Sequence, residues 1–422
     1  MSGAFLTRAL LLTSLFLPAS LLAGCGGDDP GGQDAGTPTL EPLVEMAYLV
    51  GEAEGGAWDS FSRVGMVTFD EDGNLYILDA NAHRVSVVDP QGEVVLQFGN
   101  RGEGPGELRV PRGLVVLPDG EVGVADAGHR GFLIFGPEGE HRRTIRLPEG
   151  AMVDGNLLLP HLGDGAVFAS RAFTITSEGG RMSVPTEIPI RRVALVSGDD
   201  DGAEASVLHE AWLPPRDMGE ERTMTGPAGT LRLAGRTMRA FEPQLHLAVL
   251  PDGRIAVADS STYRIEILGP DGEPAGVVER PIPPRVLTER EREEERQRRL
   301  DELDEGGGPQ FQLVSGGVTL DQGDMREMLQ EQVQEMEFWP EIPVIRRLAA
   351  DREGRLWVGR SGAPNQPGPI DILTPEGEVV GSIPADAMAF PDAFGPDGLA
   401  AWIELDELEV ARVRVGRVRG VG

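Results

Sequence analysis

A short string built around an Asp-Gly turn recurs along the chain and constrains its fold more than any other feature. Residues 72–79 read as such a turn followed by an alternating strand, and residues 119–126 and 252–259 repeat the pattern. Weaker copies begin at Asp164, Glu353 and Asp397. Glycine suits these turns because it adopts positive φ without steric cost. The alternation of apolar and polar residues after each turn is typical of half-buried antiparallel strands.

The spacing of the copies indicates a β-propeller. Their turn glycines are Gly73, Gly120, Gly165, Gly253, Gly354 and Gly398. Three of the gaps, 47, 45 and 44 residues, match one four-stranded propeller blade. The other two, of 88 and 101 residues, contain no further Asp-Gly hairpin and are interpreted as insertions. The predicted fold is therefore all-β, a six-bladed propeller.

The ends of the repeat region predict how the ring closes. The last copy has strand patterns at residues 399–404 and 409–415, then only a short tail, so it lacks one strand. An unassigned strand pattern lies at residues 43–50, before the first copy. We expect this N-terminal strand to complete the last blade, which would leave no open sheet edge in the ring.

The N-terminus has the layout of a secretory signal: Arg8, then an apolar run over residues 9–17, then small residues. Residues 21–25 resemble the lipobox of bacterial lipoproteins, which implies cleavage after residue 24 and a lipid on Cys25. The alternative is that Cys25 is an ordinary cysteine of the protein core. Since Cys25 is the only cysteine, disulfides within the chain are excluded. Residues 25–40 are expected to form a flexible tether and 41–422 the propeller.

These features predict an exported protein whose membrane contact is the lipid anchor only. Because Gly26 follows the cysteine, we expect the protein to be anchored in the outer membrane, on its periplasmic side or at the cell surface.

The formal charge is −31, from 69 acidic and 38 basic residues, and every basic residue is arginine. So acidic a surface repels phosphate backbones and excludes nucleic acid as a partner.

Two strings in the first blade carry a family resemblance. Asp79 followed by residues 83–85 (His-Arg-Val), and residues 98–108 (Phe-Gly-Asn-Arg-Gly-Glu-Gly-Pro-Gly-Glu-Leu), resemble NHL-type repeats. More narrowly, they resemble the six-bladed NHL-like propeller lipoproteins of environmental bacteria. The resemblance covers most of residues 41–415 and implies the fold. It implies little about function, because such propellers include scaffolds, receptors and a few enzymes.

Strand order predicts that one face of the ring is plain and the other elaborated. With alternating strand directions, every short Asp-Gly and Pro-X-Gly-Glu turn lies on one face. The long segments all fall on the other face: 171–190, 213–240, 281–343 and 360–369. Binding residues tend to lie on loops held by a rigid scaffold, so the second face is the predicted functional face.

The longest insertion, residues 285–340 between blades four and five, is predicted to be helical. Thr288 and Glu291 form a capping box that opens a polar helix to about Leu303, most of which is expected to face solvent. A second helix near Asp324 carries one apolar stripe, made of Met325, Met328, Leu329, Val333 and Met336. The stripe is interpreted as docking on its own domain, or alternatively as an adaptable partner surface. Together the helices could cover the mouth of the channel.

No catalytic motif or zinc-ligand spacing is present, so no catalytic residue, metal or cofactor is predicted. His83 and His129 each precede an arginine, as Tyr263 does, which indicates a structural slot. A metal site that adds His161 or His246 is the competing interpretation. The recurring Asp79, Asp126 and Asp259, with Arg84, Arg130 and Arg264, are interpreted as loop caps or interblade salt bridges, with a functional charge ring as the alternative.

The remaining candidate site is a set of arginines where inner strands begin or loops leave the second face: Arg112, Arg171, Arg346 and Arg360. Arginines that converge on a channel would bind an anionic ligand, and neutralisation of nearby acids is the other reading. The function we expect is non-catalytic binding of a ligand, or of an envelope protein, peptide or glycan. The alternative is a metal-dependent lyase or lactonase with its site in the channel.

Overall fold

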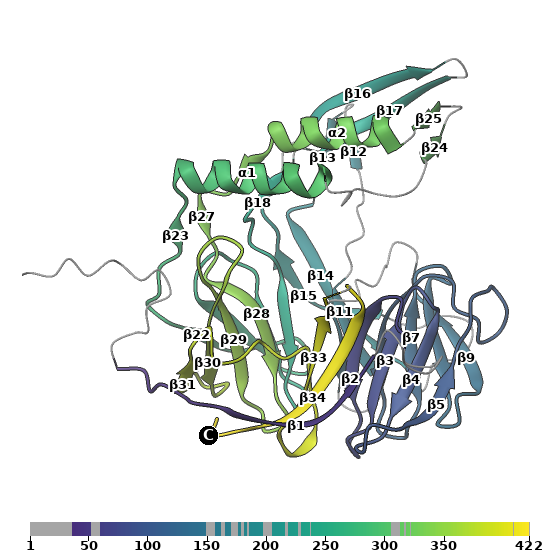
Figure 1. The fold of residues 1–422 in the computed structure, drawn as a ribbon, viewed down its shortest axis with the longest axis vertical. Coiled ribbons are helices and arrows are strands. Elements are labelled where there is room, and N and C mark those ends of the chain that lie inside the picture. Colours follow the sequence, from purple (N-terminus) through teal and green to yellow (C-terminus); the bar gives the residue numbers. More distant parts are fainter. Residues whose placement is uncertain are drawn as a thin grey trace, which may run out of the picture.

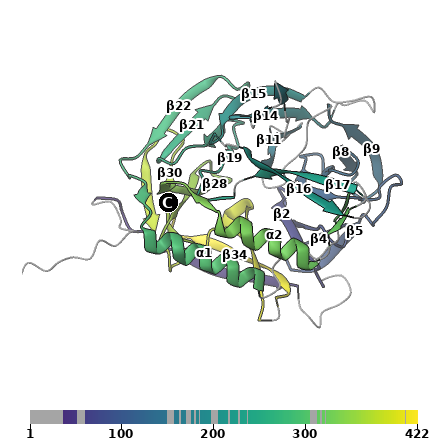
Figure 2. The ribbon, with the colours of Figure 1, turned by 90° about the horizontal axis from the view of Figure 1, so that it is seen from above.

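The computed structural model of the 422-residue chain describes residues 36–51, 60–148, 157–161, 165–169, 176–178, 181–183, 185–196, 205–215, 218–226, 229–236, 238–304, 313–315, 318–320, 322–407 and 409–421. Six four-stranded antiparallel sheets form the blades of a closed ring (Figures 1 and 2). The predicted all-β, six-bladed propeller is confirmed.

The first three blades follow the chain in order. Blade one contains β2 (Val64–Phe69), β3 (Leu75–Asp79), β4 (Arg84–Val88) and β5 (Val94–Phe98). Blade two contains β6 (Pro111–Val116), β7 (Val122–Asp126), β8 (Gly131–Phe135) and β9 (His141–Arg146). Blade three contains β10 (Leu158–His161), β11 (Gly165–Ala169), β14 (Glu187–Ala194) and β15 (Ala205–Trp212).

The other three blades lie beyond the insertions. Blade four contains β19 (His246–Val249), β20 (Ile255–Ala258), β21 (Arg264–Leu268) and β22 (Pro274–Glu279). Blade five contains β28 (Ile345–Ala350), β29 (Leu356–Ser361), β30 (Pro367–Leu373) and β31 (Val379–Ile383). Blade six contains β32 (Ala393–Phe394), β33 (Leu399–Leu405), β34 (Ala411–Arg419) and, from the N-terminus, β1 (Leu43–Val50).

The ring is sealed by the N-terminal strand, as predicted. β1 pairs antiparallel with β34, from Leu43 opposite Arg419 to Val50 opposite Val413 (Figure 1). Val50 is buried in the core that joins blades six and one. The edge of the last blade is therefore covered by residues from the other end of the described chain, which removes an exposed row of backbone donors and acceptors.

The Asp-Gly turns form as the sequence indicates. Gly73, Gly120, Gly253 and Gly354 adopt φ between 80° and 85°, where a side chain would strain the backbone. Gly398 has φ 73° in the short 3₁₀ helix Pro396–Gly398. The turn that precedes Gly165 lies outside the described residues.

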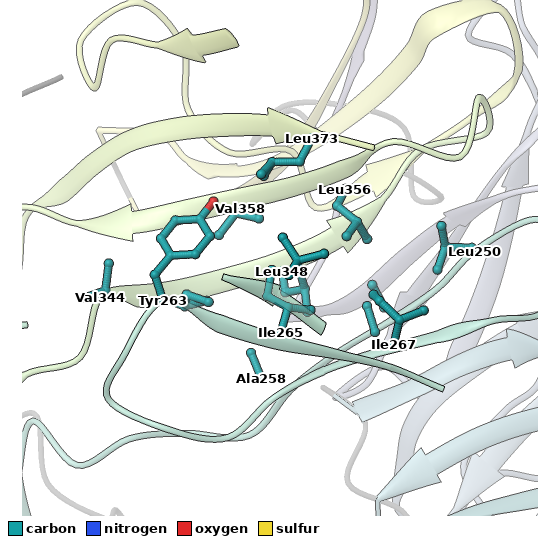
Figure 3. Packing of buried hydrophobic residues seen from close by; sticks show 14 residues of the cluster. Leu250, Ala258, Tyr263, Ile265, Ile267, Val344, Leu348, Leu356, Val358 and Leu373 are labelled. Carbon is teal, nitrogen blue, oxygen red and sulfur yellow. The ribbon is translucent and has the colours of Figure 1, made fainter. Parts of the chain in front are cut away.

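Apolar side chains fill the spaces between neighbouring blades, as Figure 3 shows for blades four and five. Ile265 and Ile267 of β21 meet Leu348, Leu356 and Val358 of blade five there, and all are at least nine-tenths buried. Each such interface excludes water from both sheets and contributes roughly 1.5–3 kcal/mol per large buried side chain. No disulfide within the chain reinforces this packing, since the sequence has a single cysteine.

The recurring aspartates cap backbone amides, which confirms the loop-cap interpretation. The carboxylate of Asp79 accepts hydrogen bonds from the amides of Ser62, Arg63 and Ala82 at 3.0, 3.0 and 3.2 Å. Asp126 and Asp259 cap amides in the same way, and their donors are Arg109, Val110, His129 and Trp212. Asp79 and Asp126 are buried, and each accepts hydrogen bonds from the loop before the inner strand of its own blade. Asp259 instead bonds Trp212 of β15, in the neighbouring blade three.

His83 and His129 do not occupy one structural slot, which corrects the sequence reading. In the strand register, Asp79 lies opposite Arg84, whereas Asp126 lies opposite Gly131. His83 and Arg130 therefore correspond, and both have positive φ, 55° and 54°. His83 lies four residues after its capping aspartate and His129 only three, so the two histidines differ by one position although both precede an arginine.

All insertions of the described chain emerge on one face, above the ring in Figure 1. Between β11 and β14 lies the hairpin β12 (Thr176–Glu178) and β13 (Arg181–Ser183). The crossing to blade four carries β16 (Met218–Gly226), β17 (Gly229–Arg236) and β18 (Arg239–Ala240). The crossing to blade five carries β23 (Arg285–Val286), α1 (Glu289–Asp304), β24 (Leu313–Ser315), β25 (Val318–Leu320), α2 (Gln322–Gln334), β26 (Glu337–Phe338) and β27 (Glu341–Ile342).

Both predicted helices are present. The capping box forms as expected, because Glu291 accepts hydrogen bonds from the amide and hydroxyl of Thr288 at 2.9 and 2.8 Å. Neither helix is long and apolar enough to cross a membrane, and the same holds for every helix in the described ranges.

Candidate functional site

Elements from two separate crossings assemble into one structure on the elaborated face, which we call the cap: residues 218–226, 229–236, 289–304, 313–315, 318–320 and 322–334. β25 contacts both β16 and β17, although about 90 residues separate them in the chain. α2 contacts α1 and β25. Figures 1 and 2 together show the two helices and the β16–β17 hairpin lying across the top of the ring.

Two small sheets join the cap to the rim. β18 pairs in parallel with β26, and β23 pairs antiparallel with β27. Arg239 strengthens the first joint, because its guanidinium bonds Glu337 at 3.0 Å and Glu242 at 3.1 Å. The first joint connects the ends of two different insertions, and the second connects the start and the end of one insertion, so the cap has fixed attachment points.

Aromatic side chains fill the space between the first joint and α1. Phe338 stacks on Phe241 with ring centroids 6.5 Å apart. The guanidinium groups of Arg292 and Arg296 lie 6.0 and 5.4 Å from the Phe338 ring centroid. Such cation–π contacts are strongest where water is excluded, and they hold this polar helix against the rim.

Many side chains of α1 are exposed, as expected, but Glu295 at its centre is 2% exposed. The Glu295 carboxylate accepts hydrogen bonds from Arg298, Arg299 and, at 2.6 Å, the side-chain amide of Asn365. Burial raises the pKa of Glu295, but these hydrogen bonds outweigh it and hold the pKa below its usual value. Asn365 belongs to the loop between β29 and β30, so a buried charge docks α1 on blade five.

The methionine-rich stripe of α2 faces the protein. Met325, Val333 and Met336 are at most 6% exposed, while Met328 and Leu329 are partly buried. The side chains that the sequence left open as a partner surface are therefore largely used in packing.

The four predicted arginines do not share one environment. Arg112 and Arg346 are exposed on the inner strands β6 and β28, each at a register shift of its strand. A bulge of this kind turns a side chain out of the regular ladder. Arg360 on β29 is only 5% exposed, and Arg171 lies outside the described residues. That these residues act on one ligand remains a prediction.

A cleft of about 70 Å³ opens beside Arg360 on the elaborated face, between blades four and five. Its polar lining includes Arg285 of β23, a residue that sequence analysis did not single out. The apolar lining consists of Ile282, Pro283, Ile342, Pro343, Val344 and Pro369. Nothing in the repeat pattern marks Arg285, because it lies in an insertion; the β23–β27 joint brings it to blade five.

The charges at this cleft are unevenly matched. The buried Asp371 bonds Arg280 at 2.6 Å and the Ser382 hydroxyl at 2.8 Å. Arg360 Nε lies 3.5 Å from the same carboxylate and makes no hydrogen bond. Arg285 bonds Glu291 through Nη1 at 2.7 Å, while its Nε and Nη2 are buried without an acceptor. Several other described arginines also have a buried Nε without a hydrogen bond, but in Arg285 Nη2 is unpaired as well. Buried donors are rarely left unpaired, so the pair of free nitrogens on Arg285 is notable.

The histidines give no sign of a metal centre in the described ranges, where no three His, Cys, Asp or Glu side chains are grouped to hold a metal ion. His246 lies on the inner strand β19. Burial and the nearby charge of Arg347 lower its pKa to about 4, so it is neutral at pH 7. The side chain of His161 and the predicted lipid-bearing Cys25 lie outside the described residues.

Comparison with known proteins adds no family. No family model matches the chain, and no curated protein matches it. A candidate exported protein of Bacteroides fragilis is similar in structure, with 11% identity and a TM-score of 0.49 over 90% of this chain and 96% of that one. A member of the DUF4221 family from Bacteroides vulgatus has 9% identity and a TM-score of 0.47 over 90% and 99%. A luciferin-regenerating enzyme has 11% identity and a TM-score of 0.42 over 90% and 97%.

At such low identities and TM-scores these likenesses carry no argument about function. The assignment as a six-bladed β-propeller rests on the six sheets and on the closure by β1. The resemblance to NHL-like lipoproteins and the predicted lipid anchor stay predictions.

Proposed function

We propose that this protein is a non-catalytic binding propeller, held in the bacterial cell envelope by a lipid on Cys25. It engages an envelope protein, peptide or glycan on the face that carries the cap. One observation carries the proposal: the described insertions all lie on one face, and those on either side of blade four join in one cap, while the described turns of the other face are short.

The construction of the cap supports a role in recognition. Its attachment uses buried charge and stacked aromatic rings, such as Glu295 with Asn365 and Phe338 with Phe241. The ring closes through β1 without the cap, so the cap is not needed to complete the ring. A rigid platform with an elaborated rim is the arrangement by which many folds present binding surfaces.

Photo-crosslinking in the cells that make the protein tests the proposal. Gln297 on α1 and Gln91 in the outer turn of blade one are both exposed glutamines, on the cap and on the plain face respectively. A photoreactive amino acid at position 297 should trap a discrete partner, and the same residue at position 91 should not. Equal trapping at both positions, or none at either, would refute the assignment of the face.

The anchor is tested separately by fractionation. Cys25→Ala should move the protein from the membrane fraction to the soluble fraction after export, because it removes the lipid attachment point. Ser20→Ala, in the same signal region, is the control and should leave the distribution unchanged. Retention of the Cys25→Ala variant in the membrane would contradict lipid anchoring.

A further inference from the structure

The cleft between blades four and five has the features of a binding site for a small anion. Arg285 reaches it from β23 and Arg360 from β29, and apolar side chains form the remaining walls. The protein carries a net charge of −31, so it repels anions at long range. A site for one must therefore be built locally, from arginine N–H groups that the chain's own carboxylates leave without an acceptor, as at Arg285 and Arg360.

The edge of the Arg285 guanidinium that suits a carboxylate has no hydrogen-bond partner. Its Nη1 is used by Glu291, whereas Nε and Nη2, which point to the same side of the planar group, have no acceptor. Two parallel N–H donors of this kind bind a carboxylate with both of its oxygens. The side chain keeps 29% of its surface exposed, so rotation about its outer bonds can turn this edge into the cleft.

Arg360 adds a buried positive charge. Its side chain is 5% exposed, and its Nε lies 3.5 Å from the Asp371 carboxylate without a hydrogen bond. The same carboxylate also accepts hydrogen bonds from Arg280 and Ser382, so two arginines share one negative charge. A buried guanidinium with an incompletely matched charge favours an additional anion nearby. The two arginines come from separate parts of the chain, and the β23–β27 pairing holds them at one cleft.

The shape and walls of the cleft narrow the ligand class. A volume of about 70 Å³ admits only a compact group. Three prolines, two isoleucines and a valine line it, and these suit an aliphatic body better than a polyhydroxylated one. We propose that this cleft binds a compact carboxylate with a short aliphatic chain, held side-on by Arg285 and neutralised by Arg360.

Calorimetry on the full chain in low-chloride buffer tests this site. 3-Methylbutanoate represents a free short carboxylate, N-acetylvaline represents the C-terminus of a peptide, and 3-methylbutanamide is the neutral isostere. We expect saturable binding of at least one carboxylate and none of the amide. The tighter of the two carboxylates identifies the source of the ligand.

The variants are chosen to separate the site from the fold. Arg285→Gln should weaken binding about tenfold or more, because it removes charge-assisted hydrogen bonds. Arg290→Gln, an exposed arginine on the neighbouring α1, is the matched control and should change affinity less than about twofold. Arg360→Lys keeps the charge of the second arginine but loses its planar group. Melting temperatures of all three variants verify that they are folded.

Three outcomes would overturn the proposal: no saturable binding of either carboxylate, inorganic phosphate binding as tightly as the carboxylates, or equal affinity in Arg285→Gln and the unsubstituted protein. The site does not depend on the proposed partner of the cap. Crosslinking from position 297 in the Arg285→Gln background therefore distinguishes a failure of this site from a failure of the proposed function.

Discussion

The Glu295 carboxylate of α1 accepts a hydrogen bond of 2.6 Å from the Asn365 side-chain amide of blade five, across 70 residues of sequence. This contact ties the helical insertion to the ring. Glu295 also bonds Arg298 and Arg299, so a carboxylate that is 2% exposed is matched on every side. One buried negative charge therefore contributes to the docking of α1 on blade five.

Replacing that charge should loosen α1 on blade five without unfolding the ring. Glu295→Gln leaves two arginines without their buried partner, which costs about 3 kcal/mol. Hydrogen–deuterium exchange should increase in α1 and remain unchanged in the blades. Glu293→Gln, where the carboxylate is 70% exposed and bonded to Arg296, is the control and should change stability by less than about 0.5 kcal/mol.

The same carboxylate predicts the response of the cap to acid. The pKa of Glu295 is lowered in the folded protein, so its contribution to docking is complete above the ordinary carboxyl pKa of 4.5. That contribution is lost as the pH falls below 4.5 through the lowered folded pKa. Exchange in α1 should therefore rise at acidic pH in the unsubstituted protein, and the pH dependence should be weaker in Glu295→Gln.

His246 should make the whole ring sensitive to mild acid. Its pKa is 6.5 unfolded and about 4 folded, so between these values the unfolded chain binds more protons and stability falls as the pH falls. The free energy of unfolding should drop by about 2 kcal/mol from this residue between pH 7.5 and pH 4.5. Urea denaturation of His246→Gln at both values should show a correspondingly smaller drop; an identical drop would contradict the assignment.

The capping aspartates should be costly to neutralise. Asp79→Asn replaces an oxygen acceptor that serves backbone amides, including those of Ser62 and Arg63. Loss of charge-assisted hydrogen bonds at a fully buried position should lower stability by about 2–3 kcal/mol. Asp119→Asn, on an exposed turn of blade two, is the comparison, and its effect should stay within about 0.5 kcal/mol. Chemical denaturation of both variants measures the difference.

Removing the N-terminal strand should open the ring. A chain that begins at residue 52 lacks β1, exposes the edge of β34 and loses the buried Val50. We expect a loss of about 3 kcal/mol or more and concentration-dependent association through the uncovered edge. A chain that begins at residue 36 keeps β1 and should behave as the full chain in size-exclusion chromatography and thermal melts. Equal stability of the two truncations would mean that β1 does not seal the ring.

Local patterns carried most of the fold. The Asp-Gly turns, the period-two strands and the blade-length spacing predicted six blades, and the missing strand of the last copy predicted the pairing of residues 43–50 with the C-terminal strand. These features depend on neighbours in sequence, or on a repeat that can be compared with itself. Thr288 and Glu291 marked the start of α1 for the same reason.

The site was less predictable, because it is built from segments that do not repeat. Arg112, Arg346 and Arg360 could be named from their places in the blades, but their different exposure depends on bulges and on packing. Arg285 was missed because only the β23–β27 pairing places it beside Arg360. The burial of Glu295 was missed because so polar a helix is expected to be exposed to solvent. Only the contact with Asn365, 70 residues further along the chain, shows that this carboxylate is buried.

The amino-acid sequence by itself determined the number of blades, the closure of the ring and the face on which the insertions emerge, since turn chemistry and strand alternation act over a few residues. Only the tertiary structure decided that two separate insertions form one cap. It also decided that a buried carboxylate docks α1, and that Arg285 and Arg360 share a cleft. Those relationships are contacts between residues that lie far apart in the sequence, and no local sequence pattern specifies such contacts.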